Sequence, residues 1–504
     1  MASTLVTPIQ IAPRLDYSML RRFSFGFGLL FVFVSPACPD PLALAVGAFT
    51  PWLILRLVGT PTMPAVIAYY LLSQWLQVFA RAFLALVDGE PMAQSIYGPW
   101  VLNAYWYMLA STVALAVACK LVLGGIQPPS QENWTAHLYW RPVDVFLVYL
   151  GSNLITQMAG LTFGGVLYQF FDAIARFKIM AAFLLFTSVM SVGRGWPFLF
   201  AVLAIEVVSG MTGLFGDFRG VFVFLGTAAL AAQIRWTART TGYAFIATFA
   251  LIALALFWTA VKFDYRELAT GGGGETQAFQ ASTSERVGYM LGRMAGAADI
   301  DWGSASKTLL ERLAYVDITG LVINVDLASA EQQSVRQWRD ALSHVFQPRF
   351  LFPDKQALSD TEVFIRLTKA DLLENMRGGT SISVGYMAEN YVDFGFPGML
   401  GGVFAIGLLV ALVIRFFFSF DVPWMVRQGT ALAFVYSICA SGLEVSLPKI
   451  LGTALTFTVA YGLALKFAFP VGQRWLEHRA RQAADREATR RRIKGLFRSG
   501  GGPV

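Results

Sequence analysis

The feature that most constrains this chain is a series of apolar runs, most of them long enough to cross a bilayer. A transmembrane helix needs about 20 mainly apolar residues. Only 14% of the 504 residues are charged, against about a quarter in soluble proteins. The sequence therefore predicts an all-α polytopic membrane protein with about 12 transmembrane helices, although the first two runs could form a re-entrant pair. The runs are 23–37, 40–57, 63–86, 97–124, 143–161, 178–193, 196–211, 217–233, 242–262, 394–419, 426–442 and 447–470.

The 131 residues between the ninth and tenth runs predict a mainly helical extracytoplasmic loop domain, because a structureless loop of that length is unusual. "SERVGYMLGRMAG" and "SASKTLLERLAYVDITGLVINVDL" carry apolar residues at helical spacing. Ser282 or Ser284 could cap the first helix, and Ser304 or Ser306 the second. We therefore expect four parts: a membrane bundle of about nine spans (1–262), the helical cap loop (263–393), a bundle of about three spans (394–470) and a basic tail (471–504).

The distribution of Lys and Arg predicts which side of the membrane each connection occupies. Connections on the cytoplasmic side carry an excess of these residues, and the outer connections around 38–40 and 87–95 contain none. From Arg474 to Arg498 there are nine basic and three acidic residues, which suits a cytoplasmic anchor on anionic lipid better than nucleic-acid binding. Both termini are therefore expected in the cytoplasm. The inner basic residues are Arg56, Lys120, Arg141, Arg194, Arg235, Arg239, Arg415 and Arg427.

The chain shows no pattern typical of a metal or nucleotide site. Its three cysteines and three histidines are scattered and form no metal-ligand spacing. It has no P-loop, no G-x-S-x-G elbow and no G-x-G-x-x-G after a strand. We expect neither a metal nor a cofactor.

The stretch "FGDFRGVFVFLG", residues 215–226, places Asp217 and Arg219 at the outer mouth of a span. Two residues apart, they do not share a helix face. An acid suits a helix N-terminus, whereas a cation there opposes the helix dipole. Arg219 therefore calls for an anionic partner; the alternative is a simple interfacial cap.

The loop stretch "HVFQPRFLFPDK", residues 344–355, combines two prolines with basic residues. The prolines exclude an ordinary helix interior and would present Arg349 and Lys355 from a rigid turn. Arginine suits bidentate phosphate binding, and lysine adds a point charge. A solvated loop is the alternative interpretation.

The stretch "RGGTSISVGYMAENYVDFGFPGMLGG", residues 377–402, precedes the tenth span. The glycine, serine and threonine residues of this stretch, together with Arg377, suit a site for a sugar or a lipid headgroup. Tyr386 and Tyr391 are amphipathic and suit the boundary between water and lipid. An interfacial re-entry loop is the alternative. Arg176, Lys178 and Lys449 are also expected on the outer side, as ligand contacts or snorkelling side chains. The ionisable residues in or near spans are expected to have structural or snorkelling roles; they are Asp144, Glu206 and Glu444.

These motifs, in this order and on this side, resemble those of the Wzy-type polysaccharide polymerases and the related O-antigen ligases. "GDFRG" resembles their S-R-G motif, with Phe218 where serine is common. "PRFLFPDK" resembles the PR…P.K segment of the polymerases. "GYMAENYVDFGFPGML" resembles the element that opens the following span.

The resemblance implies a metal-independent glycosyltransferase in the bacterial inner membrane. It would polymerise undecaprenyl-pyrophosphate-linked oligosaccharide repeats on the outer membrane face, with a chain-length regulator and a flippase as further partners. Arg219 and Arg349 would hold the diphosphate, and the general base would be Asp217, His344 or Glu389. Substrate contacts are expected from Lys355, Arg176, Arg377, Tyr386 and Tyr391.

Two rival functions share part of this pattern. An O-antigen ligase performs the same transfer onto another lipid acceptor. A lipid-linked oligosaccharide flippase or transporter would also have about twelve spans, but it would carry charge at mid-membrane depth and favours inverted repeats, which this sequence does not show.

Overall fold

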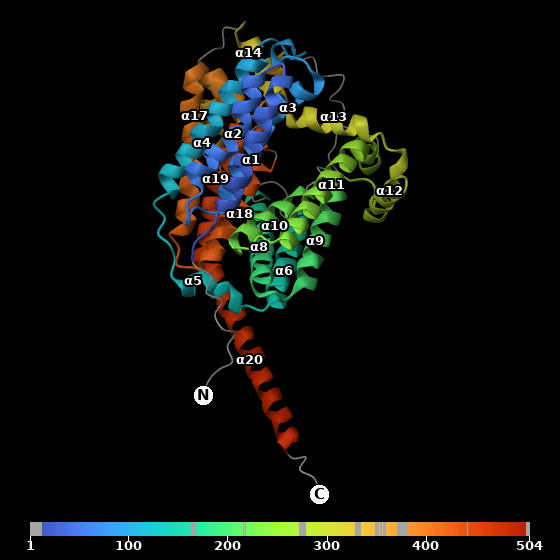
Figure 1. The fold of residues 1–504 in the computed structure, drawn as a ribbon. Coiled ribbons are helices and arrows are strands. Elements are labelled where there is room, and N and C mark those ends of the chain that lie inside the picture. The colour runs from blue at the N-terminus through green and yellow to red at the C-terminus, as the bar shows by residue number, and fades with distance from the viewer. Residues whose placement is uncertain are drawn as a thin grey trace.

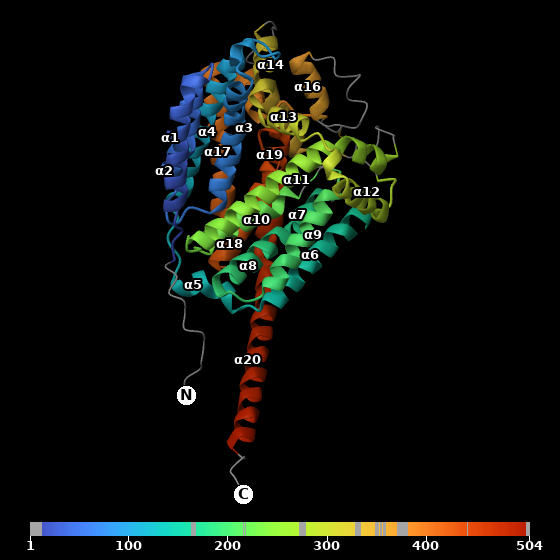
Figure 2. The same ribbon diagram turned by 45° about the vertical axis from the view of Figure 1, so that its right-hand side comes forward.

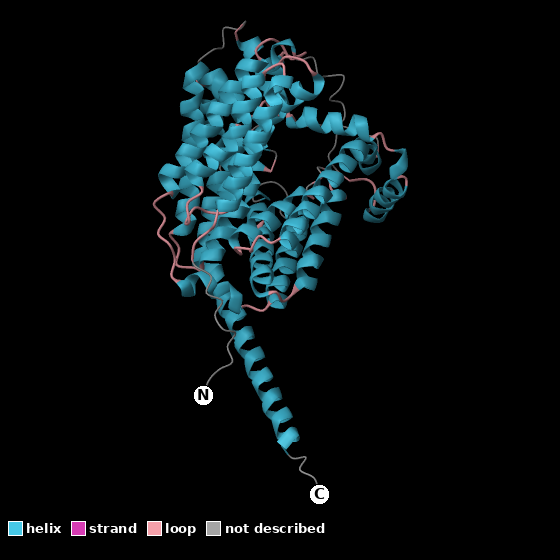
Figure 3. Ribbon diagram, viewed as in Figure 1, coloured by secondary structure: helices cyan, strands magenta, loops and turns pink. Residues whose placement is uncertain are grey.

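The described part of the chain is built from helices and connections, with no strand (Figure 3). The structure is a computed structural model, and it describes residues 13–162, 168–214, 216, 218–271, 279–327, 334–347, 352, 355, 359–369, 382–440 and 442–499. Each of the apolar runs falls mainly on one helix. These helices are α1 (Ser18–Val34), α2 (Pro41–Val58), α3 (Val66–Asp88), α4 (Val101–Leu123), α6 (Pro142–Thr162), α8 (Phe177–Val192), α9 (Trp196–Met211), α10 (Arg219–Ala231), α11 (Ala238–Thr270), α17 (Tyr386–Phe418), α18 (Trp424–Cys439) and α19 (Leu447–Leu463).

Eight segments in the described residues are long and apolar enough to cross a membrane by themselves. Part of α6 (Pro142–Ile155) and the whole of α9 and α10 are shorter apolar helices, and α18 is short with most of its residues buried. The protein is thus a multi-pass, all-helical membrane protein. The eight segments are Ser18–Ala37, Pro41–Val58, Val66–Asp88, Val101–Leu123, Phe171–Val192, Ala238–Thr270, Tyr386–Phe418 and Leu447–Thr489.

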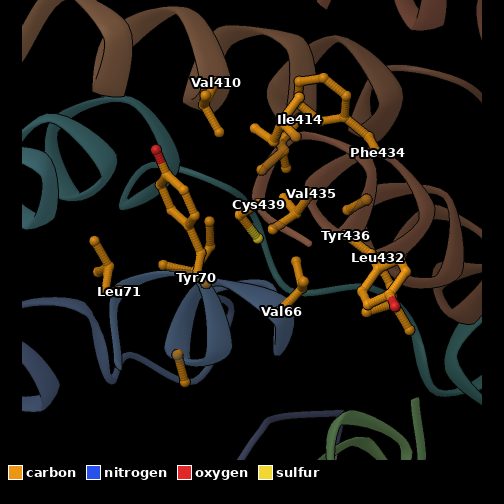
Figure 4. Packing of buried hydrophobic residues seen from close by; sticks show 14 of the residues in the cluster. Val66, Tyr70, Leu71, Val410, Ile414, Leu432, Phe434, Val435, Tyr436 and Cys439 are labelled. Carbon is orange, nitrogen blue, oxygen red and sulfur yellow. The ribbon is translucent and has the colours of Figure 1, made fainter. Parts of the chain in front are cut away.

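The helices form two groups that share α18. In one group α4 and α17 pack along each other, beside the pair α1 and α2. In the other, α8 packs against α6, α10 and α18 (Figure 2). Side chains of α3, α17 and α18 fill the space between their helices, with Tyr70, Ile414 and Cys439 among them (Figure 4).

The connections at the two ends of the bundle differ in character. At one end, which we call the tail end, the terminal helix α20 (Phe469–Ser499) leaves the bundle (Figure 1). Arg14 and Leu15 lie there too, since the Leu15 amide donates to the Pro61 carbonyl and the Gln233 side chain donates to the Arg14 carbonyl. We call the other end the head end. It carries α12 (Thr283–Ala295), α13 (Trp302–Leu313), α14 (Val316–Asp326), α15 (Arg336–Phe346) and α16 (Asp360–Thr368).

The loop between α11 and α17 is helical where it is described, as predicted, but its details differ from expectation. Ser282 caps α12 with a capping box that includes Glu285. The second helix is capped by Asp301, whose carboxylate accepts from the Ser304 amide at 3.0 Å, so neither Ser304 nor Ser306 is the cap. It also breaks after Leu313, which gives two helices, α13 and α14, in place of one.

Two bundle helices extend beyond the predicted spans. α11 continues to Thr270, and α17 begins at Tyr386 and is interrupted by the non-helical residues Gly395 and Phe396. Gly395 has φ of +61°, which glycine tolerates, and the following Pro397 has no amide to donate. The polar first turns of α17 therefore belong to the helix, although the apolar pattern starts only at residue 394.

Glu206 and Asp144, the two carboxylates that the sequence places in spans near their predicted ends, both have partners. Glu206 pairs with Lys178 at 3.0 Å and accepts from the Tyr149 hydroxyl at 2.6 Å. Asp144 is fully buried and pairs with Arg479 of α20 at 3.2 Å. A buried carboxylate needs such a partner, so these residues join helices.

Candidate anion-binding site

Arg219 is the first residue of α10, and residues of α11 stabilise the turn before it. Arg266 of α11 donates to the Leu214 carbonyl at 3.0 Å. Gly216 has φ of +66°, and a Cβ atom there would lie 2.5 Å from the indole nitrogen of Trp258. The glycine of "GDFRG" is therefore required by both backbone conformation and space, and this turn fixes where α10 begins.

A second arginine supports the same turn. Arg286 of α12 donates to the Thr212 carbonyl at 2.6 Å. Thr212 and Leu214 follow the last residue of α9, where helix carbonyls lack intrahelical donors and the dipole favours cations. Two arginines of the large loop region and its preceding helix thus anchor the head-side end of α9.

The Arg219 side chain is exposed and extends toward the end of α18. Its Nη2 atom lies 3.4 Å from the Ala440 carbonyl oxygen. The adjacent Gly220 lies against Tyr436, where a Cβ atom would be 2.4 Å from the phenol oxygen. The second glycine of the motif therefore lets α10 approach α18 closely.

Arg312 of α13 and Glu444 bring two more charges to Arg219. Glu444 ends the short 3-10 turn Gly442–Glu444 between α18 and α19. Burial raises the pKa of its carboxyl, although Arg312, Arg219 and Lys449 oppose the rise. Burial lowers the pKa of Arg312, with Glu444 opposing this change and Arg219 adding to it. We call Arg219, Arg312 and Glu444 the head-end cluster; Lys449 lies beside it, where Asp360 pairs with it.

The positive region continues along α11. Arg312 lies near both Arg266 and Lys262. The Lys262 side chain is only 4% exposed, and its ammonium lies 4.6 Å from the ring centre of Phe263. Arg312 thus lies near cations of both α10 and α11, and Arg219 and Arg312 themselves lie near Glu444. Like charges this close repel one another, and a bound anion would offset that repulsion.

Arg176 is the residue that precedes the first turn of α8. It pairs with Asp172 at 3.0 Å and is close to the phenol groups of Tyr461 and Tyr436. Tyr436 is therefore close to Arg176 and packs against Gly220, the residue after Arg219.

Glu389 is buried and binds a helix N-terminus. Its side chain is on α17, and the residue is 3% exposed. Its Oε2 atom accepts from the backbone amide of Leu447, the first residue of α19, at 2.7 Å. This bond satisfies one of the orphan donors of α19.

Asp393, one helical turn further along α17, binds a second helix N-terminus. Its two oxygens accept from the Gln337 amide at 3.0 Å and the Trp338 amide at 2.8 Å, both in the first turn of α15. The Trp338 indole also donates to Asn390 at 2.9 Å. The acidic element that opens α17 thus fastens α15 and α19 to the bundle.

The two tyrosines proposed as substrate contacts pack inside the protein. Tyr386 is 1% exposed, and its hydroxyl donates to Gln74 of α3 at 3.1 Å. Tyr391 is 7% exposed and is stacked near Tyr107 of α4, with ring centroids 6.1 Å apart. In this conformation they join α17 to α3 and α4.

His344 and Lys355 come together on α15 and the segment after it. The Lys355 ammonium donates to the backbone carbonyl of His344 and, at 2.9 Å, to that of Gln347. α15 packs along α19. Asp217, Arg349 and Arg377 lie outside the described residues.

The sequence interpretation did not select Arg312, Lys262 or Arg266. Arg312 belongs to a stretch whose spacing predicts only an amphipathic helix, and nothing local distinguishes it from the other charged residues there. Glu444 carries a weak signal, since it is a carboxylate beside a predicted span. Its proximity to Arg219 and Arg312 depends on segments more than a hundred residues away.

No known protein family, curated protein or solved structure matches this chain. The chemistry of the site is therefore argued from its own groups. Guanidinium groups form short, charge-assisted bonds to phosphate oxygens, and a carboxyl whose pKa is raised is suited to proton transfer. The head-end cluster can thus hold a phosphate ester and move a proton beside it.

Proposed function

We propose that this protein is a membrane glycosyltransferase that polymerises undecaprenyl-pyrophosphate-linked oligosaccharide repeats on the outer face of the bacterial cytoplasmic membrane. The observation that carries the proposal is that Arg219, Arg312 and Glu444 lie close enough on the head side of the bundle to interact electrostatically. A lipid diphosphate is an anion whose headgroup lies at the membrane surface, where the head-end cluster is proposed to be. Because the diphosphate is already a good leaving group, the transfer needs no metal.

The proposed sidedness follows from the charge at the tail end. Arg141 and Arg479 flank Asp144 there, and Arg415 and Arg427 bond to carbonyls of the connections around Val122 and Val422. Because basic connections favour the cytoplasm, the tail end would be cytoplasmic, with both termini inside and twelve crossings. The head-end cluster would then face outward.

In the proposed reaction, Arg219 and Arg312 hold the two phosphates of the donor. The bond between the anomeric carbon and the diphosphate oxygen breaks, and the leaving group keeps the electron pair. Donors placed where that negative charge develops stabilise the transition state. Arg349, which the resemblance implies as the second diphosphate ligand, keeps that proposed role beside them.

Glu444 is the general base in this proposal, because it lies near Arg219 and Arg312. The acceptor sugar hydroxyl attacks the anomeric carbon and gives its proton to this carboxylate. Burial raises the pKa of Glu444, which brings a carboxyl closer to the operating pH and makes it a better base. Glu389, in contrast, is engaged with the first amide of α19.

Arginine substitution in cells tests this proposal. Arg219→Ala and Arg312→Ala should leave single repeats on the carrier lipid at the outer face, while long glycan disappears. Lys307→Ala is the matched control, because Lys307 is on α13, is mostly exposed and has only a 3.8 Å contact to Asp88. Long polymer in both arginine variants would refute the assignment.

The same experiment separates the rival functions. A flippase defect would leave the repeats facing the cytoplasm, where externally added probes cannot reach them. A ligase defect would leave long glycan on its carrier lipid instead of on the final acceptor. Either result would replace the polymerase assignment.

A further inference from the structure

A second cationic site lies at the tail end, far from the head-end cluster, where α20 passes the start of α6 (Figure 1). A pocket of about 390 Å³ opens between these two helices. A neighbouring pocket of about 460 Å³ shares Arg141 with it and includes Arg194. The first pocket is lined by Arg141, Arg479, Gln482, Ala483, Arg486 and Glu487.

A buried carboxylate positions two of the arginines. Asp144 is fully buried, and its Oδ1 atom accepts from Arg479 at 3.2 Å. The Oδ2 atom lies 3.6 Å from Arg141 and has no hydrogen-bond partner. Arg479 also lies 5.9 Å from the ring centre of Trp475. One carboxylate between two guanidinium groups leaves their combined charge only half neutralised.

The other two arginines of these pockets are Arg194 and Arg486. Within the residues that the structure describes, no carboxylate pairs with Arg194 or Arg486. The two pockets therefore contain four arginines against the carboxylates of Asp144 and Glu487, a surplus of two positive charges. Such a surplus in a concave site favours an anion.

The surroundings indicate an anion attached to a lipid. Trp196 directly follows Gly195 of the second pocket, and Trp475 lies one helical turn before Arg479 of the first. Each tryptophan is 42% exposed, and tryptophan is enriched at the headgroup level of membranes. The wall shared with Arg194 is apolar, with Val143 and Phe198. A soluble anion would gain nothing from that wall, whereas a glycerol backbone and its acyl chains would pack against it.

We propose that these two pockets bind the phosphodiester headgroup of an anionic glycerophospholipid. Arg486 and Arg194 contact the phosphate from either side, and Arg141 and Arg479, held by Asp144, complete the site. Basic pockets between helices on the cytoplasmic side are suited to such headgroups. Lipid bound here would also fix α20 against α6.

Lipid titration of the purified full-length protein tests this assignment. The protein is held in a neutral detergent, and dioctanoyl phosphatidylglycerol, dioctanoyl phosphatidylcholine or inorganic phosphate is added while the thermal midpoint is followed. Ligand that binds only the folded state raises this midpoint in a concentration-dependent manner. Arg486→Gln and Arg194→Gln remove one charge each, and Arg481→Gln is the matched control, since its side chain is 80% exposed on α20 outside the pocket.

Phosphatidylglycerol should stabilise the protein saturably, phosphatidylcholine should not, and each of the two variants should weaken the affinity about fivefold. Equal stabilisation by phosphatidylcholine would overturn the proposal, as would an equal loss in Arg481→Gln. Stabilisation by inorganic phosphate at the same concentrations would overturn the lipid assignment and indicate a soluble phosphate ligand.

Discussion

Arg81 of α3 and Asp317 of α14 form an ion pair of 2.8 Å in which both side chains are less than a tenth exposed. Asp317 also lies 3.4 Å from the Ser95 hydroxyl. The pair therefore joins the loop between α11 and α17 to a membrane helix, beside the position where α13 also packs on α3. Because α13 carries Arg312, this joint helps to place the head-end cluster.

Removing one partner of this pair should strongly destabilise the protein. Asp317→Leu leaves the buried guanidinium of Arg81 with neither a counter-charge nor the carboxyl oxygen that accepts its hydrogen bond, which typically costs about 3–5 kcal/mol. Thermal unfolding in detergent measures the loss. An apolar pair, Arg81→Met with Asp317→Leu, should recover most of it, and a single variant with unchanged stability would contradict the prediction.

The same carboxyl should make stability depend on pH. Burial raises the pKa of Asp317 to about 6, although Arg81 and Ser95 oppose the rise. Since this value lies above that of an unfolded aspartate, about 3.9, the folded state binds the proton more tightly. The contribution of Asp317 to stability is therefore full at pH values below its pKa in the unfolded state. It is lost as the pH rises through its pKa in the folded state.

Lowering the pH from 7 to 5 should therefore stabilise the wild type by about 1 kcal/mol through Asp317. The comparison is the pH dependence of the thermal midpoint in the wild type and in Asp317→Asn, which lacks the titrating group. Identical pH profiles in the two proteins would show that this carboxyl does not titrate in that range.

The Asp393 carboxylate should control the docking of α15. Asp393→Ala removes the acceptor for the Gln337 and Trp338 amides, a loss comparable to that of an N-cap residue, about 1 kcal/mol. Hydrogen exchange should increase in the first turn of α15. Asp340→Ala, which removes an exposed acid of the same helix, should leave that exchange unchanged; equal exchange in the two variants would count against the cap.

The apolar runs predicted the helices of the bundle because a membrane leaves an apolar stretch of that length few alternatives. The start of α17 was not predictable in the same way. Its first turns contain Glu389, Asn390 and Asp393, and these polar residues predict a loop before the apolar run. They are helical because α19 and α15 supply amide donors to both carboxylates, and those partners are distant in sequence.

The candidate site was predictable only in part, for the same reason. Arg219 stands out because a cation at the start of a span conflicts with the helix dipole. No local sequence rule distinguishes Arg312 or Lys262 from other charged residues. The two come close only because α11 and α13 pack together. Arg81, inside the third apolar run, gains its partner only when α14 folds onto α3.

Gly216 should be required for the position of Arg219. Gly216→Ala would impose a left-handed conformation on alanine, about 1–2 kcal/mol, and would place its Cβ against the Trp258 ring. The turn should shift, and with it the first residue of α10, so that polymer formation in cells falls together with thermal stability. Gly213→Ala in the same turn is the matched control, because its Cβ would be no closer than 3.4 Å to any neighbour. If Gly216→Ala supports wild-type polymer lengths at normal protein levels, the turn does not position the arginine in the way we describe.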